Sequence, residues 1–419
     1  MYEISTLPSG LRVITAPTDA TAAVTVLVLA GAGSRYEEPA ERGISHFLEH
    51  MFFKGGKKYK NTKEVAAAID SVGGEFNAFT GKEYAGYYVK VTGGHVALAC
   101  DVLGDMLQHA SFPQEEIEKE RGVIMEEERM YQDTPMYRAG WDFELLLYGD
   151  QPLGWDTIGT EEVIRRVDQV DFQAHKDRLY TPDNLVAAFA GSIDHKKAVA
   201  LAEKAFGAIK GKKTREFPKF TSYGKENLYL RSKQTEQAHL VLGVPGLPHE
   251  HPDRFAQKLL GVMLGGTMSS RMFLNIREAR GLCYYISTEV DEYLDAGSLT
   301  TRAGVDQSRL AEAITAVREE YRACAAGGVT EEELHRAKEY IKGKSVLGLE
   351  DSEERAHFVG KQVLLYPEVM TLEEYLKRID AVTKKQVDAL AKKLLVPAEM
   401  RLVVIGSEKD EKKLRTLLH

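Results

Sequence analysis

Residues Ser45 to Lys54, Ser-His-Phe-Leu-Glu-His-Met-Phe-Phe-Lys, combine residue types that can bind a metal ion. In a helix, with about 100° per residue, His46, Glu49 and His50 fall on one face. Residues one helical turn apart are roughly 5–6 Å from each other, so the two imidazoles can hold one ion, and Glu49 can reach its open position. The order His-x-x-Glu-His inverts the His-Glu-x-x-His zinc helix. The same spacing is also compatible with two ordinary core histidines.

The opposite face of this predicted helix is apolar and would pack into a core; it comprises Ile44, Phe47, Leu48, Met51 and Phe52. A second helix is predicted after Pro113, where Ser111-Phe-Pro-Gln114 resembles a capping box with proline in the first turn. On its wheel, Glu120 and Glu127 lie seven residues apart, on one stripe with Ile117, Val123, Ile124 and Tyr131.

Two carboxylates on an apolar stripe cost several kcal/mol unless they are paired or metal-bound. Glu127 and Glu120 are therefore candidates for completing a site that has two histidines and lacks a third ligand. A solvated acidic helix face would produce the same run of glutamates.

An extended stretch, Glu75 to Thr80, follows Gly73-Gly74, and Tyr84 to Val91 is strand-like beyond it. The alternation and the flanking glycines favour a strand at a sheet edge. Such an edge can accept an extended peptide as an added strand, although an ordinary hairpin has the same pattern.

The bulk composition restricts the class of protein. A chain of 419 residues predicts two or more domains, and a net charge of -8 argues against nucleic acid as the main ligand. Cys100, Cys283 and Cys324 are few and odd in number, which indicates a reducing compartment and argues against a cysteine zinc site. No signal peptide or membrane-spanning run is visible, so we expect a cytoplasmic protein without a membrane partner.

The second half of the sequence repeats the pattern of the first. Matching motifs are nearly evenly offset: position 379 follows 167 by 212 residues, position 252 follows 39 by 213, and position 407 follows 192 by 215. We therefore predict an α+β fold of two duplicated domains, each a mostly antiparallel β-sheet covered by helices. The predicted ranges are 1–211 for the first domain, 212–226 for a linker and 227–419 for the second. When Pro39 is aligned with Pro252, the positions of His46, Glu49 and His50 are taken in the second half by apolar residues: Leu259, Val262 and Met263.

Three blocks of the sequence resemble the family of inverted-motif zinc peptidases that includes pitrilysin, insulin-degrading enzyme and mitochondrial processing peptidase. The blocks are His46 to Gly55, Gly74 to Thr80 with Tyr87-Tyr88, and Glu120 to Glu127. The resemblance covers nearly the whole chain, in the short bacterial form. It implies that Glu127 is the third zinc ligand and that Glu120 supports the site.

A further block, Arg277 to Tyr284, resembles the Arg/Tyr pair that contacts substrate in these peptidases. In the short members, two subunits face each other and enclose a chamber. The resemblance therefore implies a dimer in which Arg277 and Tyr284 serve the zinc of the partner subunit.

Together these features predict a zinc-dependent endopeptidase that hydrolyses extended or unstructured peptides. His46, His50 and Glu127 would hold one Zn²⁺ per chain, with Glu49 as general base. Arg277 and Tyr284 would stabilise the oxyanion or fix the peptide. The edge strand would pair with the substrate main chain through Phe76, Asn77, Ala78, Phe79 and Thr80. We expect a homodimer, with a heterodimer as the alternative; the alternative function is a non-catalytic scaffold or recognition subunit.

Overall fold

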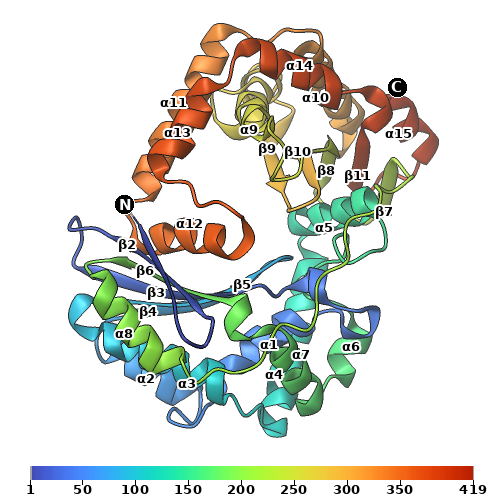
Figure 1. The fold of residues 1–419 in the computed structure, drawn as a ribbon. Helices are drawn as coiled ribbons and strands as arrows, with labels where there is room; N and C mark the ends of the chain where they lie inside the picture. Colours follow the sequence, from blue (N-terminus) through green and yellow to red (C-terminus); the bar gives the residue numbers. More distant parts are fainter. Residues whose placement is uncertain (1, 419) are drawn as a thin grey trace. The chain divides into compact units, whose positions relative to one another are not determined.

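The computed structural model describes residues 2–418 and divides into two compact units (Figure 1). Unit 1 consists of Met1–Glu128, Asp156–Pro218 and Lys344–Glu373. Unit 2 consists of Arg129–Trp155, Lys219–Gly343 and Glu374–His419. Each unit contains one β-sheet.

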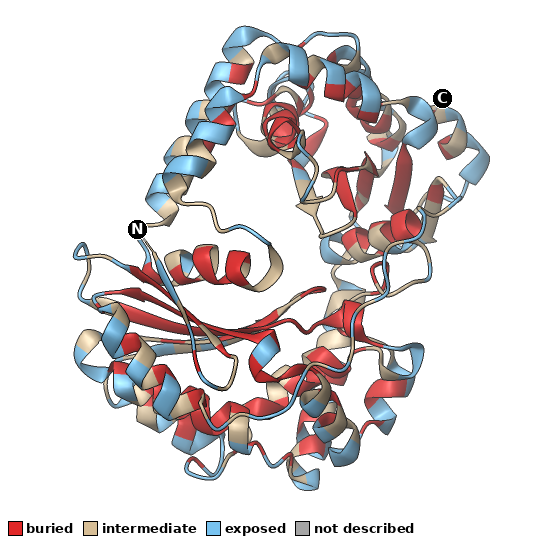
Figure 2. Cartoon of the chain, in the orientation of Figure 1, coloured by how far each residue is buried: buried red, intermediate tan, exposed pale blue. Residues whose placement is uncertain are grey.

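The sheet of unit 1 has the order β1-β2-β6-β3-β5-β4, and only β2 and β6 pair in parallel. Its strands are β1 (Glu3–Thr6), β2 (Arg12–Pro17), β3 (Ala23–Ala30), β4 (Glu75–Thr80), β5 (Ala85–Thr92) and β6 (Leu185–Gly191). The central strands β3 and β6 are buried on both faces, which explains their nearly continuous apolar sequences (Figure 2). Strand β4 lies at the edge and pairs with β5.

Helices cover both faces of this sheet. Ile14 packs against α12 (Ser352–Leu365) on one face. The next residue, Thr15, points the other way and contacts His195 at the start of α8 (His195–Phe206). Helix α3 (Val96–His109) packs on strands β3 and β5.

The sheet of unit 2 has the order β7-β11-β8-β10-β9, with only β7 and β11 parallel. Its strands are β7 (Leu228–Ser232), β8 (Gln237–Pro245), β9 (Cys283–Glu292), β10 (Gly297–Asp306) and β11 (Arg401–Gly406). Order and pairing sense match β2-β6-β3-β5-β4 of unit 1, strand for strand. The predicted duplicated α+β fold is confirmed.

Each unit includes one helix from the other half of the sequence. Helix α5 (Pro135–Tyr148) belongs to unit 2, where its Phe143 and Leu147 pack with Val241 and Val403. Helix α12 belongs to unit 1. The compact units are therefore discontinuous in sequence, whereas we expected continuous ranges; the domain boundaries 1–211 and 227–419 stay a prediction. Apolar periodicity shows that a helix has a buried face but does not show which sheet receives it.

The remaining α-helices are α1 (Ile44–Phe52), α2 (Thr62–Asp70), α4 (Gln114–Asp133), α6 (Glu161–Arg166), α7 (Gln169–Leu179), α9 (Arg254–Gly261), α10 (Leu310–Ala325), α11 (Glu331–Gly348), α13 (Leu372–Ala381), α14 (Lys384–Leu394) and α15 (Glu411–Leu417). Among residues 2–418, no helix combines the length and apolarity needed to cross a membrane. The three cysteines are buried and free.

Candidate metal centre

Helix α1 begins next to a buried carboxylate. Gly43, at the N-cap position, has φ 95° and offers no side chain to the first turn. Glu37 replaces the missing cap, since its carboxylate accepts hydrogen bonds from the backbone N–H of Gly43 at 2.8 Å and of Ser45 at 2.9 Å. Burial raises the pKa of Glu37 to about 7. This arrangement anchors the first turn of α1 immediately before His46.

The apolar face of α1 is packed into the core of unit 1. The ring centroids of Phe47 and Phe172 are 4.9 Å apart, and those of Phe52 and Tyr87 are 5.1 Å apart. These contacts orient the helix so that its polar side chains lie on the other face.

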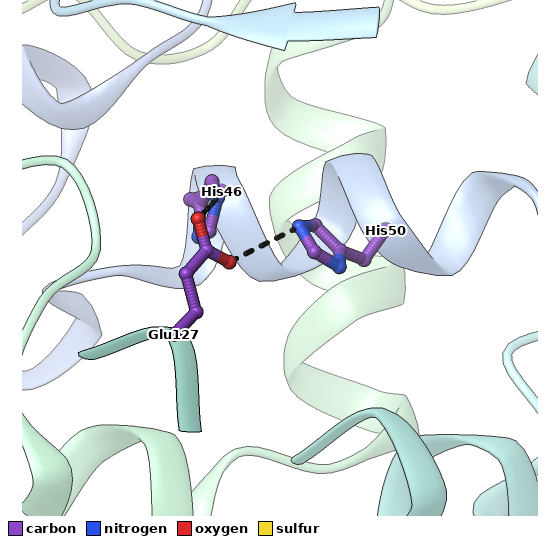
Figure 3. Close-up of side chains that lie close together, drawn as sticks. All are labelled: His46, His50 and Glu127. Carbon is purple, nitrogen blue, oxygen red and sulfur yellow. Dashed lines mark ion pairs between the residues drawn. The ribbon is translucent and has the colours of Figure 1, made fainter. Parts of the chain in front are cut away.

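The polar face of α1 meets Glu127 of α4 (Figure 3). His46 Nε2 lies 3.8 Å from Glu127 Oε1, and His50 Nε2 lies 3.8 Å from Glu127 Oε2. One ligand atom from each residue lies within 4.8 Å of the others. Tetrahedral zinc with bonds of about 2.0–2.1 Å separates its ligand atoms by roughly 3.3 Å, so two imidazoles and this carboxylate fit the ion after a small contraction.

The second glutamate of α4 contacts the outer side of His50. Glu120 Oε1 lies 2.9 Å from His50 Nδ1, and its other oxygen forms an ion pair with Lys54. A carboxylate in this position holds the proton on Nδ1 and directs Nε2 towards a metal. The contact with Lys54 was not predicted, since Lys54 lies two residues beyond the end of α1, where helical spacing no longer applies.

One part of the predicted stripe on α4 is wrong. The wheel grouped Val123 with the buried residues, but its side chain is 51% exposed. The buried residues of α4 are Ile117, Glu120, Ile124 and Met125. The buried face is therefore narrower at this point than the predicted stripe.

Burial and neighbouring charges alter the ionisation of the site. Burial, assisted by the nearby His50, lowers the pKa of His46 to about 3. Burial also lowers the pKa of His50, but the hydrogen bond to Glu120 and the surrounding carboxylates outweigh it and raise that pKa. Although burial raises the pKa of Glu120, its bonds to His50 and Lys54 lower it overall. His46 is thus neutral, which is the form that binds metal.

Glu49 is on the same helix face and approaches β4. Burial raises the pKa of its carboxyl group, and Thr80 Oγ1 donates a hydrogen bond to its Oε2 at 2.5 Å. This side-chain contact was missed, because the sequence pointed only to the main chain of the edge strand.

The predicted substrate strand exposes some of its side chains. Asn77 is exposed and accepts a hydrogen bond from the N–H of Ala78. Phe76 contacts the ring of Phe53, and Phe79 contacts Tyr84. The strand is therefore anchored by its aromatic residues.

Arg277 and Tyr284 lie together in unit 2, whereas the candidate metal ligands His46, His50 and Glu127 belong to unit 1. Arg277 Nε donates to the carbonyl oxygen of Tyr284 at 2.9 Å, and its guanidinium lies over the ring of Phe273. The side chain of Tyr284 is 78% exposed and free to contact another molecule.

A two-sheet α+β chain with a His-His-Glu cluster and an adjacent glutamate has the features of a zinc peptidase of the inverted-motif class. Residues 12–146 match the family model described as Insulinase (Peptidase family M16), and residues 166–341 match the one described as Peptidase M16 inactive domain. The chain belongs to peptidase family M16.

Relatives of similar length support this assignment. An uncharacterized zinc protease of Mycobacterium leprae is 38% identical over 399 residues, which cover 93% of this chain and 88% of the relative. Another, of Bacillus subtilis, is 38% identical over 397 residues, covering 94% and 96%.

Two solved structures share the fold. A protease from Helicobacter pylori has a TM-score of 0.90 at 22% identity and covers 97% of this chain and 99% of its own. A peptidase M16 inactive domain from Pseudomonas fluorescens has a TM-score of 0.90 at 19% identity, with 98% of each chain covered.

Proposed function

We propose that this protein is a zinc-dependent endopeptidase that hydrolyses extended or unstructured peptides. The observation that carries the proposal is the cluster of His46, His50 and Glu127, with Glu49 on the same helix face. Membership of a family whose relatives are named zinc proteases supports the metal.

The chain's own residues would divide the chemistry. His46, His50 and Glu127 would hold zinc, which when bound lowers the pKa of a coordinated water towards neutrality. Glu49 would accept the proton of the attacking water and deliver it to the nitrogen of the leaving amine. Glu120 would keep His50 in the tautomer and orientation that ligation needs.

The proposed substrate binds along β4. This strand is at the edge of its sheet, so the side away from β5 can pair with an extended main chain. Pairing through backbone groups of Phe76 to Thr80 selects for extended shape more than for sequence. A folded substrate cannot supply such a strand without local unfolding.

We infer that the working form is a homodimer, in which Arg277 and Tyr284 act on the peptide bound at the partner subunit's metal. The exposure of Tyr284 and its contact with Arg277 support a role outside their own unit. Mixing Arg277→Ala with Glu49→Gln subunits should restore at most one working site per dimer. Full activity of pure Arg277→Ala would refute the role in trans.

A non-catalytic subunit is the alternative, since the model matching residues 166–341 is described as an inactive domain. That range contains the apolar Leu259, Val262 and Met263. The five proposed site residues of α1 and α4 instead fall within residues 12–146: His46, Glu49, His50, Glu120 and Glu127.

Zinc content, together with cleavage of a fluorogenic unstructured peptide, tests the two functions. The endopeptidase predicts about one zinc per chain and cleavage that is lost with a chelator and restored by zinc. A zinc-loaded protein that cleaves no unstructured peptide would support the non-catalytic function.

A further inference from the structure

The last residue of β4 contacts the proposed general base through its side chain. Thr80 Oγ1 donates to Glu49 Oε2 at 2.5 Å, a short hydrogen bond of the charge-assisted kind. Among residues 2–418, no hydrogen bond to the other oxygen, Oε1, is formed. The contact therefore engages one carboxylate oxygen and leaves the other able to accept a proton.

The backbone of Thr80 is held by regular pairing. Thr80 lies opposite Ala85 in the antiparallel ladder of β4 and β5. The turn between the strands is closed by a hydrogen bond from the N–H of Gly81 to the carbonyl of Tyr84 at 2.9 Å. Thr80 is thus the end of a strand rather than part of a loose loop.

A second segment, Gly33 to Tyr36, fastens the same turn. The N–H of Arg35 donates to the carbonyl of Lys82 at 2.9 Å. Gly33 has φ 145°, and a Cβ there would fall 2.4 Å from the carbonyl oxygen of Gly81, so only glycine allows this approach.

A buried ion pair adds to this attachment. Arg35 Nη1 donates to Glu83 Oε1 at 2.5 Å, and the two side chains are only 1% and 6% exposed. A buried pair of this kind is costly to break from one side, because the remaining charge loses its partner. The turn that follows Thr80 is therefore held by a backbone hydrogen bond to Lys82 and by an ion pair to Glu83, both from Arg35.

We propose that Thr80 is a positioning residue whose hydroxyl holds Glu49 in the orientation needed for proton transfer. The inference rests on the proposed endopeptidase function and assigns Thr80 a role separate from main-chain pairing with substrate. A hydroxyl on a locked strand end restricts the rotation of the Glu49 carboxylate, and catalysis depends steeply on such orientation.

The two roles of Thr80 can be separated, because its main chain and its hydroxyl contact different partners. Loss of strand pairing weakens peptide binding and raises KM. Loss of the hydroxyl leaves the strand in place and lowers kcat, since the base is present but poorly oriented. Thr80→Val retains the β-branched shape without the hydroxyl, and Thr80→Ser retains the hydroxyl.

The experiment compares zinc-loaded wild type, Thr80→Val and Thr80→Ser on a fluorogenic unstructured peptide, with zinc content measured for each. We expect Thr80→Val to keep its zinc and, within about twofold, its KM, while its kcat falls about 10-fold, a part of what a general base contributes. Thr80→Ser should recover most of the lost kcat.

Thr25→Val is the matched control. Its hydroxyl is buried in β3 of the same sheet and lies 2.8 Å from Ser352 Oγ. This variant loses a comparable threonine contact away from Glu49, so its kcat should stay at the wild-type value.

Three results would overturn the inference: an unchanged kcat in Thr80→Val, a kcat that Thr80→Ser does not restore, or a higher KM at unchanged kcat. Zinc-loaded wild type that cleaves no peptide would instead overturn the proposed function, and this inference with it. The two failures are distinguished by the wild-type measurement.

Discussion

Helix α1 of unit 1 and its counterpart in unit 2 occupy equivalent places but differ in chemistry. Helix α1 packs against the edge strand β4, and α9 with the helical segment Val262–Gly266 packs against the edge strand β9. The residues aligned with the two histidines are Leu259 and Met263, which are 0% and 4% exposed. In unit 2 these positions hold core side chains.

The arrangement of sheet and helices therefore does not require metal-binding side chains, since unit 2 has apolar residues at the aligned positions. The same strand order forms in both units, since it depends on apolar periodicity and turn positions. The candidate metal centre depends on a few polar side chains on α1 and on the distant Glu127. The two units therefore share one fold and differ in the small set of side chains that make up the candidate site.

The largest expected effect on kcat comes from replacing Glu49, the carboxylic acid of α1 whose aligned position in unit 2 is Val262. Glu49→Gln should lower kcat by roughly 10²–10⁴-fold, because the base is lost while the three ligands remain. Peptide cleavage and zinc content, measured together, check this result. Wild-type turnover in a zinc-loaded Glu49→Gln protein would contradict the role of Glu49.

The next effect concerns the ligand that α4 provides. Glu127→Gln should reduce bound zinc from about one ion per chain to a small fraction, because an amide is a weak ligand. Glu126→Gln is the control, since Glu126 is adjacent and exposed. Equal zinc loss in both variants, measured by metal analysis after dialysis, would show that Glu127 is not the specific ligand.

The converse change places two histidines at the aligned positions of unit 2. Leu259→His with Met263→His should bind no additional zinc, because the buried positions belong to a core. The double variant should lose about 2–4 kcal/mol of unfolding free energy, from lost packing and buried polar groups. Urea unfolding and metal analysis measure the two effects. A second zinc ion per chain would contradict the prediction.

The smallest effect is a pH dependence at the start of α1. The pKa of Glu37 is raised from 4.5 in the unfolded chain to about 7 by burial. The folded state therefore binds the proton of Glu37 more tightly than the unfolded chain does. Protonated Glu37 contributes its full stabilisation below pH 4.5, and this contribution is lost as the pH rises through about 7. The loss should be at most about 3 kcal/mol.

Glu37→Gln should remove this part of the pH dependence of unfolding, measured in urea between pH 4 and pH 8, as set by the two pKa values. The aligned position in unit 2, 213 residues later, is Glu250, which is exposed. Glu250→Gln is therefore the control, with a pH profile like that of the wild type. Identical profiles for all three proteins would exclude Glu37 as the source.

Much of the fold was accessible from the sequence, since it is encoded in local patterns. The predicted strand Glu75 to Thr80 has the same bounds as β4, and the predicted helix after Pro113 begins at Gln114. The near-constant offset between the two halves correctly indicated two similar sheets. What local patterns could not specify was the exchange of α5 and α12 between the units.

The candidate site also has one part that local spacing predicted and another that depends on tertiary packing. Helical spacing alone placed His46, Glu49 and His50 on one face, because i and i+4 positions are neighbours in any helix. The exposure of Val123 and the hydrogen bond from Thr80 to Glu49 could not be derived from spacing, since each depends on how α4 or β4 packs against other elements.

The sequence by itself determined which side chains share a helix face, where the strands lie and that the two halves are related. These features follow from the periodicity of the backbone, which is local. Three contacts depend on the tertiary structure. Glu127 lies 3.8 Å from Nε2 of both imidazoles, Glu120 contacts both His50 and Lys54, and Thr80 at the end of β4 donates to Glu49. Those contacts join residues far apart in the chain, and their distances are set by core packing, which residue spacing does not contain.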